Sequence, residues 1–223
     1  MPARSVFIAG AGTEIGKTYV TAALTRRLRA LGRPVRTLKP LASGVPPLRD
    51  PGFVESDTAR LLDAQGLPLD ADTVESCSPW RFSAPLSPDQ AAVLEGRSVA
   101  LSDLVAWCRA QIACTAGTLL IEGVGGLMSP VTEEATGLDW LRALDLPAIL
   151  VSGSYLGAIS HALTARETLR LHGVTLLAVA VSESAGAPAP ASTVAASIAR
   201  HVDAPVYCLK RGDSCPEALA DLV

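Results

Sequence analysis

Short apolar segments alternate along the chain with longer segments in which apolar residues recur every three or four positions. This alternation is typical of strands and amphipathic helices in a β-α-β architecture. We therefore expect one doubly wound α/β domain over residues 1–223, with a mostly parallel sheet and helices on both faces. Strands are predicted at residues 5–9, 35–38, 118–121, 148–151, 176–182 and 205–207. Helices are predicted at residues 16–31, 101–114, 158–171 and 192–202, with another beginning near Asp57, whereas residues 41–55 and 67–90 are expected to be mostly irregular.

Composition and charge limit the partners of the chain. Its 223 residues carry 19 Lys and Arg against 22 Asp and Glu, a net charge of −3, which excludes nucleic-acid binding through bulk positive charge. The mean hydropathy of +0.33 is high, but a membrane span needs roughly 18 consecutive apolar residues. The longest apolar segments, at residues 146–151 and 174–181, are much shorter and are bounded by Pro, Gly or charge. We expect no nucleic acid and no membrane as partners.

The five cysteines are scattered, odd in number and without a C-x-x-C pair. A disulfide framework or a zinc site needs regular paired spacing, so we expect free thiols. The first four residues lead directly into an apolar strand, without the apolar core of a signal peptide. Both observations favour a cytoplasmic protein.

The strongest chemical signal is GAGTEIGKT at residues 10–18, between the first predicted strand and the first predicted helix. The usual phosphate-binding pattern is G-x-x-x-x-G-K-[ST], and here the first glycine, Gly10, lies one residue earlier. Backbone N–H groups of such a loop bind phosphate oxygens, and the helix dipole favours negative charge there. Lys17 can reach the β- and γ-phosphates, and the Thr18 hydroxyl can bind Mg²⁺. A glycine-rich turn can also serve packing alone, but the Gly16-Lys17-Thr18 triplet favours nucleotide binding.

Three more charged residues lie where ligands bind in open α/β sheets, beyond the carboxyl ends of strands. Lys39 is either a surface lysine or a partner of the phosphates, and Glu122 is either a turn-capping carboxylate or a magnesium ligand. Asp57 begins a helix, where it either favours the helix dipole or supplies a second carboxylate near the metal. A Lys39→Ala variant is expected to fold normally and to lose at least ~10²-fold in kcat. No Cys–His or Ser–His pair indicates covalent catalysis.

The segment LGAISH at residues 156–161 begins another predicted helix. Its free backbone N–H groups can bind an anion such as a carboxylate. His161 is either a proton carrier or a histidine on the helix surface.

Five motifs together resemble the dethiobiotin synthetase family: GAGTEIGKT, KPLASG at residues 39–44, SD at 56–57, EGVGG at 122–126 and LGAISH. The resemblance spans residues 5 to about 182, and the ordered set is specific although each motif alone is modest. It implies an ATP-dependent enzyme with a P-loop fold that closes the ureido ring of dethiobiotin from 7,8-diaminononanoate and CO₂. One amine takes up CO₂ to form a carbamate, the carbamate attacks the γ-phosphate of ATP, and the second amine displaces phosphate from the resulting anhydride.

The resemblance also implies a role for each matched residue. Catalysis is assigned to Lys39, Lys17 and Thr13, and Mg²⁺ is expected to be bound by Thr18, Asp57 and Glu122. The nucleotide is expected to contact Glu14, Ile15, Gly16, Lys17, Thr18, Tyr19, Asp57, Glu122, Gly123, Val124, Gly125, Ser182 and Glu183. The diamine is expected to bind Thr13, Lys39 and Ser43, and its carboxylate to bind Gly157, Ala158, Ile159 and Ser160 of the neighbouring subunit, because the family forms homodimers with the site at the interface.

Three positions depart from the family pattern. Gly12 replaces an aspartate, Ser160 replaces an asparagine, and Ser182 replaces an asparagine that contacts the base. The segment that follows in base recognition has no clear match in residues 208–212. We therefore predict weak base discrimination, with CTP or GTP used at rates comparable to ATP. A strong preference for ATP in kinetic assays would contradict this.

Two alternatives have a similar loop. An amide-ligase domain of the cobyrinic acid synthase group usually carries a glutaminase domain, for which 223 residues leave no room. A switch or partitioning ATPase of the MinD/ParA group carries a second lysine near the start of its loop, and residues 10–13 contain none.

Overall fold

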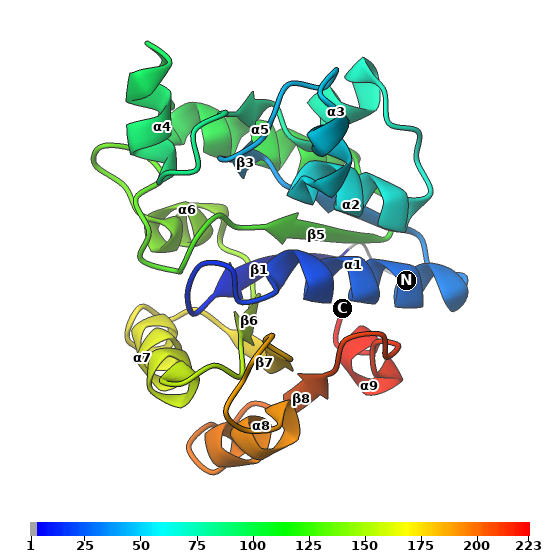
Figure 1. Ribbon diagram of the computed structural model, residues 1–223, viewed down its shortest axis with the longest axis vertical. Coiled ribbons are helices and arrows are strands. Elements are labelled where there is room, and N and C mark those ends of the chain that lie inside the picture. Colours follow the sequence, from blue (N-terminus) through cyan, green and yellow to red (C-terminus); the bar gives the residue numbers. More distant parts are fainter. Residues whose placement is uncertain (1–3) are drawn as a thin grey trace.

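The computed structural model describes residues 4–223 and contains a six-stranded sheet in the order β2-β5-β1-β6-β7-β8 (Figure 1). Every adjacent pair is parallel, which confirms the expected doubly wound α/β fold. The strands are β1 Arg4–Gly10, β2 Val35–Leu38, β5 Thr118–Glu122, β6 Ala148–Ser152, β7 Leu176–Ser182 and β8 Val206–Leu209. A separate parallel pair consists of β3 Leu41–Ala42 and β4 Trp80–Arg81.

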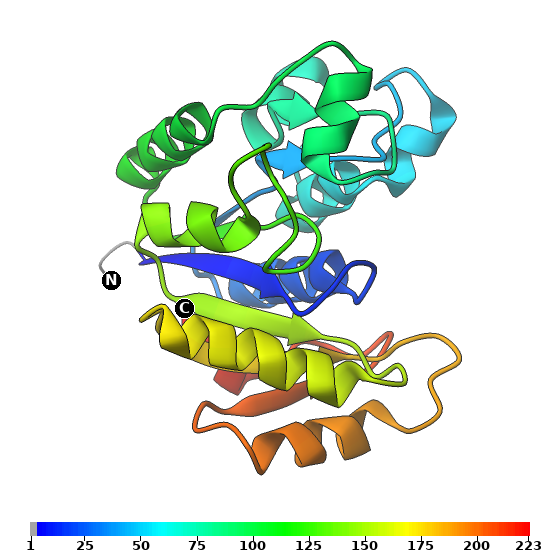
Figure 2. The same cartoon turned by 90° about the vertical axis from the view of Figure 1, so that its left-hand side faces the viewer.

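Helices cover both faces of the sheet because alternate strand residues are apolar on both sides, as in most parallel sheets (Figure 2). On one face, Phe7, Ile121 and Leu150 belong to the same core as residues of α5, α6, α7 and α8. On the other face, Ile8 and Leu120 pack with residues of α1 and α9. The helices are α1 Lys17–Ala30, α2 Asp57–Gln65, α3 Ala71–Cys77, α4 Pro88–Leu94, α5 Leu101–Cys114, α6 Gly137–Leu144, α7 Ala158–Leu171, α8 Ala191–Ala199 and α9 Glu217–Ala220. None of them, within residues 4–223, is long and apolar enough to cross a bilayer.

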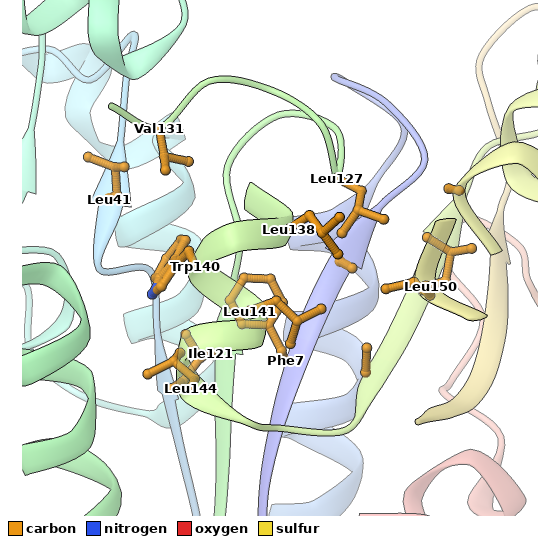
Figure 3. Packing of buried hydrophobic residues seen from close by; sticks show 14 of the residues in the cluster. Phe7, Leu41, Ile121, Leu127, Val131, Leu138, Trp140, Leu141, Leu144 and Leu150 are labelled. Atoms are coloured by element: carbon orange, nitrogen blue, oxygen red, sulfur yellow. The ribbon is translucent and has the colours of Figure 1, made fainter. Parts of the chain in front are cut away.

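Helix α6 is the main element that the apolar pattern did not predict. It has only eight residues, too few to show a clear helical period. Its N-terminus is fixed by a capping box, in which the Thr136 hydroxyl and the Asp139 carboxylate each accept a backbone N–H. Its Trp140 is fully buried and meets the Phe7 ring edge-on, with the ring centroids 5.1 Å apart (Figure 3). Packing on the sheet therefore stabilises a helix that is too short to be stable alone.

The segments expected to be irregular contain short elements, which lie on the side of β5 away from β1 (Figure 1). Residues 41–55 include β3 and a 3₁₀ helix, Pro51–Glu55, and residues 67–90 include α3, β4 and the start of α4. Each is too short, or too rich in proline and glycine, to give a periodic signal.

All six strands of the main sheet end at the same edge, because they are parallel. From β1 the chain passes to β2 on one side, and it later adds β6, β7 and β8 on the other side. The end of β1 therefore lies at the point where the strand order reverses, which is where open α/β sheets bind ligands.

Candidate active site

A cavity of about 660 Å³ opens where β1, β2 and β5 end. It is lined by the loop before α1, by the first turns of α1 and α2, and by two segments from residues 43–45 and 85–88. Of the residues expected at the site, those that line the cavity are Thr13, Glu14, Ile15, Gly16, Lys17, Thr18, Tyr19, Lys39, Ser43, Asp57, Val124 and Gly125.

The loop after β1 leaves the start of α1 open to a ligand. Gly16, the residue before the helix, has φ +93°, a left-handed conformation that favours glycine, and no side chain caps the first turn. The free N–H groups of this turn can therefore bind an anion. The Lys17 ammonium folds back over the loop and donates to the Gly12 carbonyl oxygen at 2.9 Å. A bound phosphate would replace this carbonyl as the partner of Lys17.

Lys39 joins two carboxylates beside this loop. Its ammonium nitrogen lies 2.7 Å from Glu122 Oε1 and 2.9 Å from Asp57 Oδ2, and it donates to the Gly123 carbonyl oxygen at 3.1 Å. The Thr18 hydroxyl donates to the same Glu122 oxygen at 2.6 Å. Only 2% of Lys39 is exposed, so the alternative of a surface lysine is wrong.

Local structure places each member of this cluster. Ser56 caps α2 by accepting the Ala59 N–H, so the next residue, Asp57, lies in the first turn with its carboxylate near the loop. Lys39 follows the last residue of β2, and its backbone N–H donates to the Cys77 carbonyl oxygen. Glu122 is the last residue of β5 and is completely buried. Parallel pairing of β2 with β5 brings the ends of these two strands together.

The charges in the cluster shift one another. Burial and, to a smaller extent, the positive charge of Lys39 together lower the pKa of Lys17 to about 8. Burial acts to lower the pKa of Lys39 as well, but the Asp57 and Glu122 carboxylates outweigh it and raise that pKa above its usual value. Burial acts to raise the pKa of Asp57, and the Lys39 ammonium outweighs it, which lowers the pKa of Asp57 to about 2. Lys39 and Asp57 are therefore charged at neutral pH.

The oxygen donors of the cluster fit Mg²⁺. Thr18, Asp57 and Glu122 supply a hydroxyl and two carboxylates, the ligand types that Mg²⁺ prefers beside substrate phosphates and water. Within residues 4–223, Glu122 Oε2 is buried and has no hydrogen-bond partner. An unpaired buried oxygen is costly and calls for a partner, which a metal ion or its water would supply.

Some of the expected residues lie away from the cavity. Ser182 is fully buried at the end of β7 beside Gly16, and Glu183 holds the loop that follows β8. Gly123 lies against the Phe7 ring. Within the single described chain, residues 157–160 at the start of α7 line no part of the cavity.

The structure also adds residues to the site. The cavity is lined by residues 85–88 and Arg60, which the sequence did not single out, and by Arg211, which lies in the segment 208–212 where no match to the family was found. The Ser87-Pro88 pair carries a signal that could have predicted α4, because proline favours the first helical position. Arg211 carries no such signal, since the fold alone brings it to α1.

A Gly16→Ala variant is expected to weaken ADP binding about tenfold or more. The φ of +93° strains any other residue by roughly 1–3 kcal/mol, and a Cβ at this position would collide with the Ser182 hydroxyl. Gly12→Ala is the matched control, because its Cβ would meet only ordinary contacts, at 3.5 Å or more. Calorimetric titration with ADP measures both variants, and equal affinity of Gly16→Ala and wild type would contradict the role of the loop.

The depressed pKa of Lys17 predicts a pH dependence. Because the pKa of Lys17 is about 8 in the free protein, its charge is lost as the pH rises through 8, while Lys39 and Asp57 keep theirs. Without metal, the affinity for ADP should be flat below pH 8 and fall above it by up to about tenfold per pH unit. Phosphate binding restores the charge of Lys17, so ADP binding near pH 9 should be accompanied by uptake of a proton by the protein. Calorimetry in buffers of different ionisation enthalpy measures this uptake. A constant affinity without proton uptake would contradict this.

Comparison of the sequence with known proteins finds extensive similarity. The chain is 66% identical over 221 residues to the ATP-dependent dethiobiotin synthetase BioD of Methylobacterium nodulans, which covers 98% of each chain. It is 45% identical over 199 residues to the enzyme of the same name from Acidiphilium cryptum, covering 89% of this chain and 88% of the relative. The corresponding protein of Caulobacter vibrioides is 48% identical over 186 residues, covering 83% and 82%.

Solved structures show the same fold at low sequence identity. The septum site-determining protein MinD of Pyrococcus horikoshii, complexed with Mg-ADP, matches with a TM-score of 0.52 and 14% identity over 99% of this chain and 86% of that chain. A ParA family ATPase from Chlorobium tepidum matches with a TM-score of 0.50 and 13% identity, over 98% and 87%. At this identity the likeness shows the fold alone. Residues 4–209 match the family model described as an AAA domain. By this match, and by the far higher identity to the synthetases, the chain belongs to the AAA domain family and to the family of the ATP-dependent dethiobiotin synthetases.

Proposed function

We propose that the protein converts 7,8-diaminononanoate, CO₂ and ATP into dethiobiotin, ADP and phosphate. An amine nitrogen bonds to CO₂ and releases a proton, which gives a carbamate. A carbamate oxygen attacks the γ-phosphorus and ADP leaves. The second amine then attacks the carbonyl carbon, phosphate leaves, and the five-membered urea ring is closed. Relatives that carry the name of this enzyme match between 83% and 98% of the chain.

The observation that carries the proposal is the pair of buried lysines at one cavity, beside two carboxylates. Lys17 and Lys39 place positive charge where phosphoryl oxygens gain negative charge during transfer. Among the described residues that line the cavity there is neither a cysteine nor a histidine. Positioning and electrostatic stabilisation suit a reaction whose nucleophiles all belong to the substrates.

Each residue near the cavity has a proposed part. The N–H groups of the loop and the first turn of α1 bind the ATP phosphates, with Lys17 at the β- and γ-phosphates. Lys39, Thr13 and Ser43 orient the diamine end and its carbamate against the γ-phosphate. Thr18, Asp57 and Glu122 would hold Mg²⁺, which when bound neutralises charge on the phosphate oxygens.

The carboxylate end of the substrate is proposed to bind a second copy of the chain. Residues 157–160 at the start of α7 line no part of the cavity of the described chain. Ser160 and Gly157 are exposed there, and no side chain caps the first turn of α7. The Ala158 N–H donates to the Tyr155 carbonyl oxygen, which leaves the N–H groups of residues 159 and 160 to bind an anion. In a two-fold homodimer the start of α7 of each subunit would complete the site of the other.

Product analysis tests the proposed function. The purified protein, the diamine, bicarbonate, Mg²⁺ and ATP should give a cyclic urea, detected by mass spectrometry, with one ADP for each ring closed. Omission of bicarbonate or of the diamine should abolish ADP release. Slow ADP release that ignores both substrates, with no urea formed, would instead indicate a switch ATPase and overturn the proposal.

A further inference from the structure

Arg211 lies in the loop after β8 and reaches the first turn of α1. Its guanidinium carbon lies 4.3 Å from the centroid of the Tyr19 ring. One terminal nitrogen lies 3.3 Å from the point that a Cβ at Gly16 would occupy, and the side chain lines the cavity. A side chain from the far end of the sequence is thus placed beside the phosphate-binding loop.

The loop that carries Arg211 is held by groups other than its terminal nitrogens. The Tyr19 hydroxyl donates to the Lys210 carbonyl oxygen at 2.6 Å and accepts the Gly212 N–H at 3.0 Å. The Glu183 carboxylate accepts the backbone N–H of Arg211 at 2.9 Å. Removal of the guanidinium breaks only its own Nε contact with the Glu183 carbonyl oxygen and leaves these three bonds, so the loop should stay in place.

The charge of this guanidinium is not neutralised by the protein. Its Nε donates to the Glu183 carbonyl oxygen, an uncharged group, at 3.0 Å. Within residues 4–223, the two terminal nitrogens have no hydrogen-bond partner and no carboxylate pairs with them. An arginine in this state presents donors that match two oxygens of a phosphate group.

We propose that Arg211 binds the phosphate of the nucleotide that is next to the ribose. Lys17 contacts Gly12 and lies along Gly10 on one part of the loop, and it serves the β- and γ-phosphates. Arg211 lies beside Gly16, where the loop ends, and Tyr19 in the first turn of α1, so it meets the other end of the triphosphate. A contact to phosphate rather than to the base also suits the weak base discrimination that the sequence predicts. The proposal rests on the proposed function only in requiring that a nucleotide binds this loop.

Calorimetric titration of adenosine, AMP and ADP into three proteins tests the proposal. Arg211→Ala should lower the affinity for AMP and ADP about tenfold or more, because a charge-assisted contact is lost. The affinity for adenosine should not change. Arg211→Lys should recover part of the loss, since it keeps the charge without the planar pair of donors. Lys210→Ala removes the same charge from the neighbouring residue and should change each affinity no more than about twofold.

Each other outcome overturns the proposal. If Arg211→Ala lowered the affinities for adenosine and ADP equally, the guanidinium would stack on the base. Unchanged affinities would show that it only packs on Tyr19. Equal losses in Arg211→Ala and Lys210→Ala would show a general effect of charge. If wild-type protein bound no ADP, the proposed function itself would fail, which is a distinct result.

Discussion

Replacement of Lys39 by alanine is expected to lower kcat by at least ~10²-fold, the magnitude for loss of an electrostatic stabiliser. The ammonium bridges Asp57 and Glu122 beside the phosphate-binding loop, so it acts on charge that forms at the γ-phosphate. The structure adds a second effect. Because Glu122 is completely buried, removal of its partner leaves an unpaired charge, which costs roughly 3–5 kcal/mol of stability. The expectation that Lys39→Ala folds normally is therefore revised.

Two further variants separate the effect on chemistry from the effect on folding. Lys39→Met combined with Glu122→Gln removes both buried charges and should regain much of the stability in urea titration, but not the activity. Lys210→Ala, at an exposed lysine, should change neither. Near-normal turnover of Lys39→Ala, measured as cyclic urea formed, would remove Lys39 from the mechanism.

A mixture of two inactive variants is expected to regain activity. In the proposed dimer each site combines Lys39 of one subunit with the start of α7 of the other. Lys39→Ala damages the first part, and Ser160→Glu damages the second by placing a negative charge where the substrate carboxylate binds. A heterodimer of the two has one intact site, so random reassembly of an equal mixture should give about a quarter of wild-type activity.

The single variants, each taken through the same dissociation and reassembly, are the controls. Each should stay near its own low activity. A mixture no more active than the mean of the two controls would show that each subunit completes its own site. The start of α7 would then lose its proposed role in substrate binding.

The sheet and its long helices could be predicted because their apolar positions are periodic and uninterrupted. Residues 118–122 and 148–152 are buried throughout, as expected for central parallel strands. The prediction failed where stability comes from contacts distant in sequence. Helix α6 depends on the packing of Trp140 against Phe7, and no local window of the sequence contains both residues.

The phosphate-binding loop could be predicted because its residues are contiguous and each type has one chemical use. The burial of Lys39 could not be predicted, since it depends on pairing with Glu122, 83 positions away. The same holds for Arg211, which meets Tyr19 only after the whole sheet has formed. A site whose residues lie in one contiguous segment can be predicted from sequence, whereas contacts between distant segments can be seen only in the folded structure.

The most direct measurement follows an oxygen atom from CO₂ to phosphate. With ¹⁸O-labelled CO₂, and reaction times short against exchange with water, a carbamate oxygen that attacks the γ-phosphorus is carried away on the phosphate. We expect one labelled oxygen in each phosphate released and one in each urea carbonyl. If the new oxygen in the released phosphate came only from water, the enzyme would hydrolyse ATP without transferring the γ-phosphoryl group to the carbamate. This result would contradict the proposed transfer.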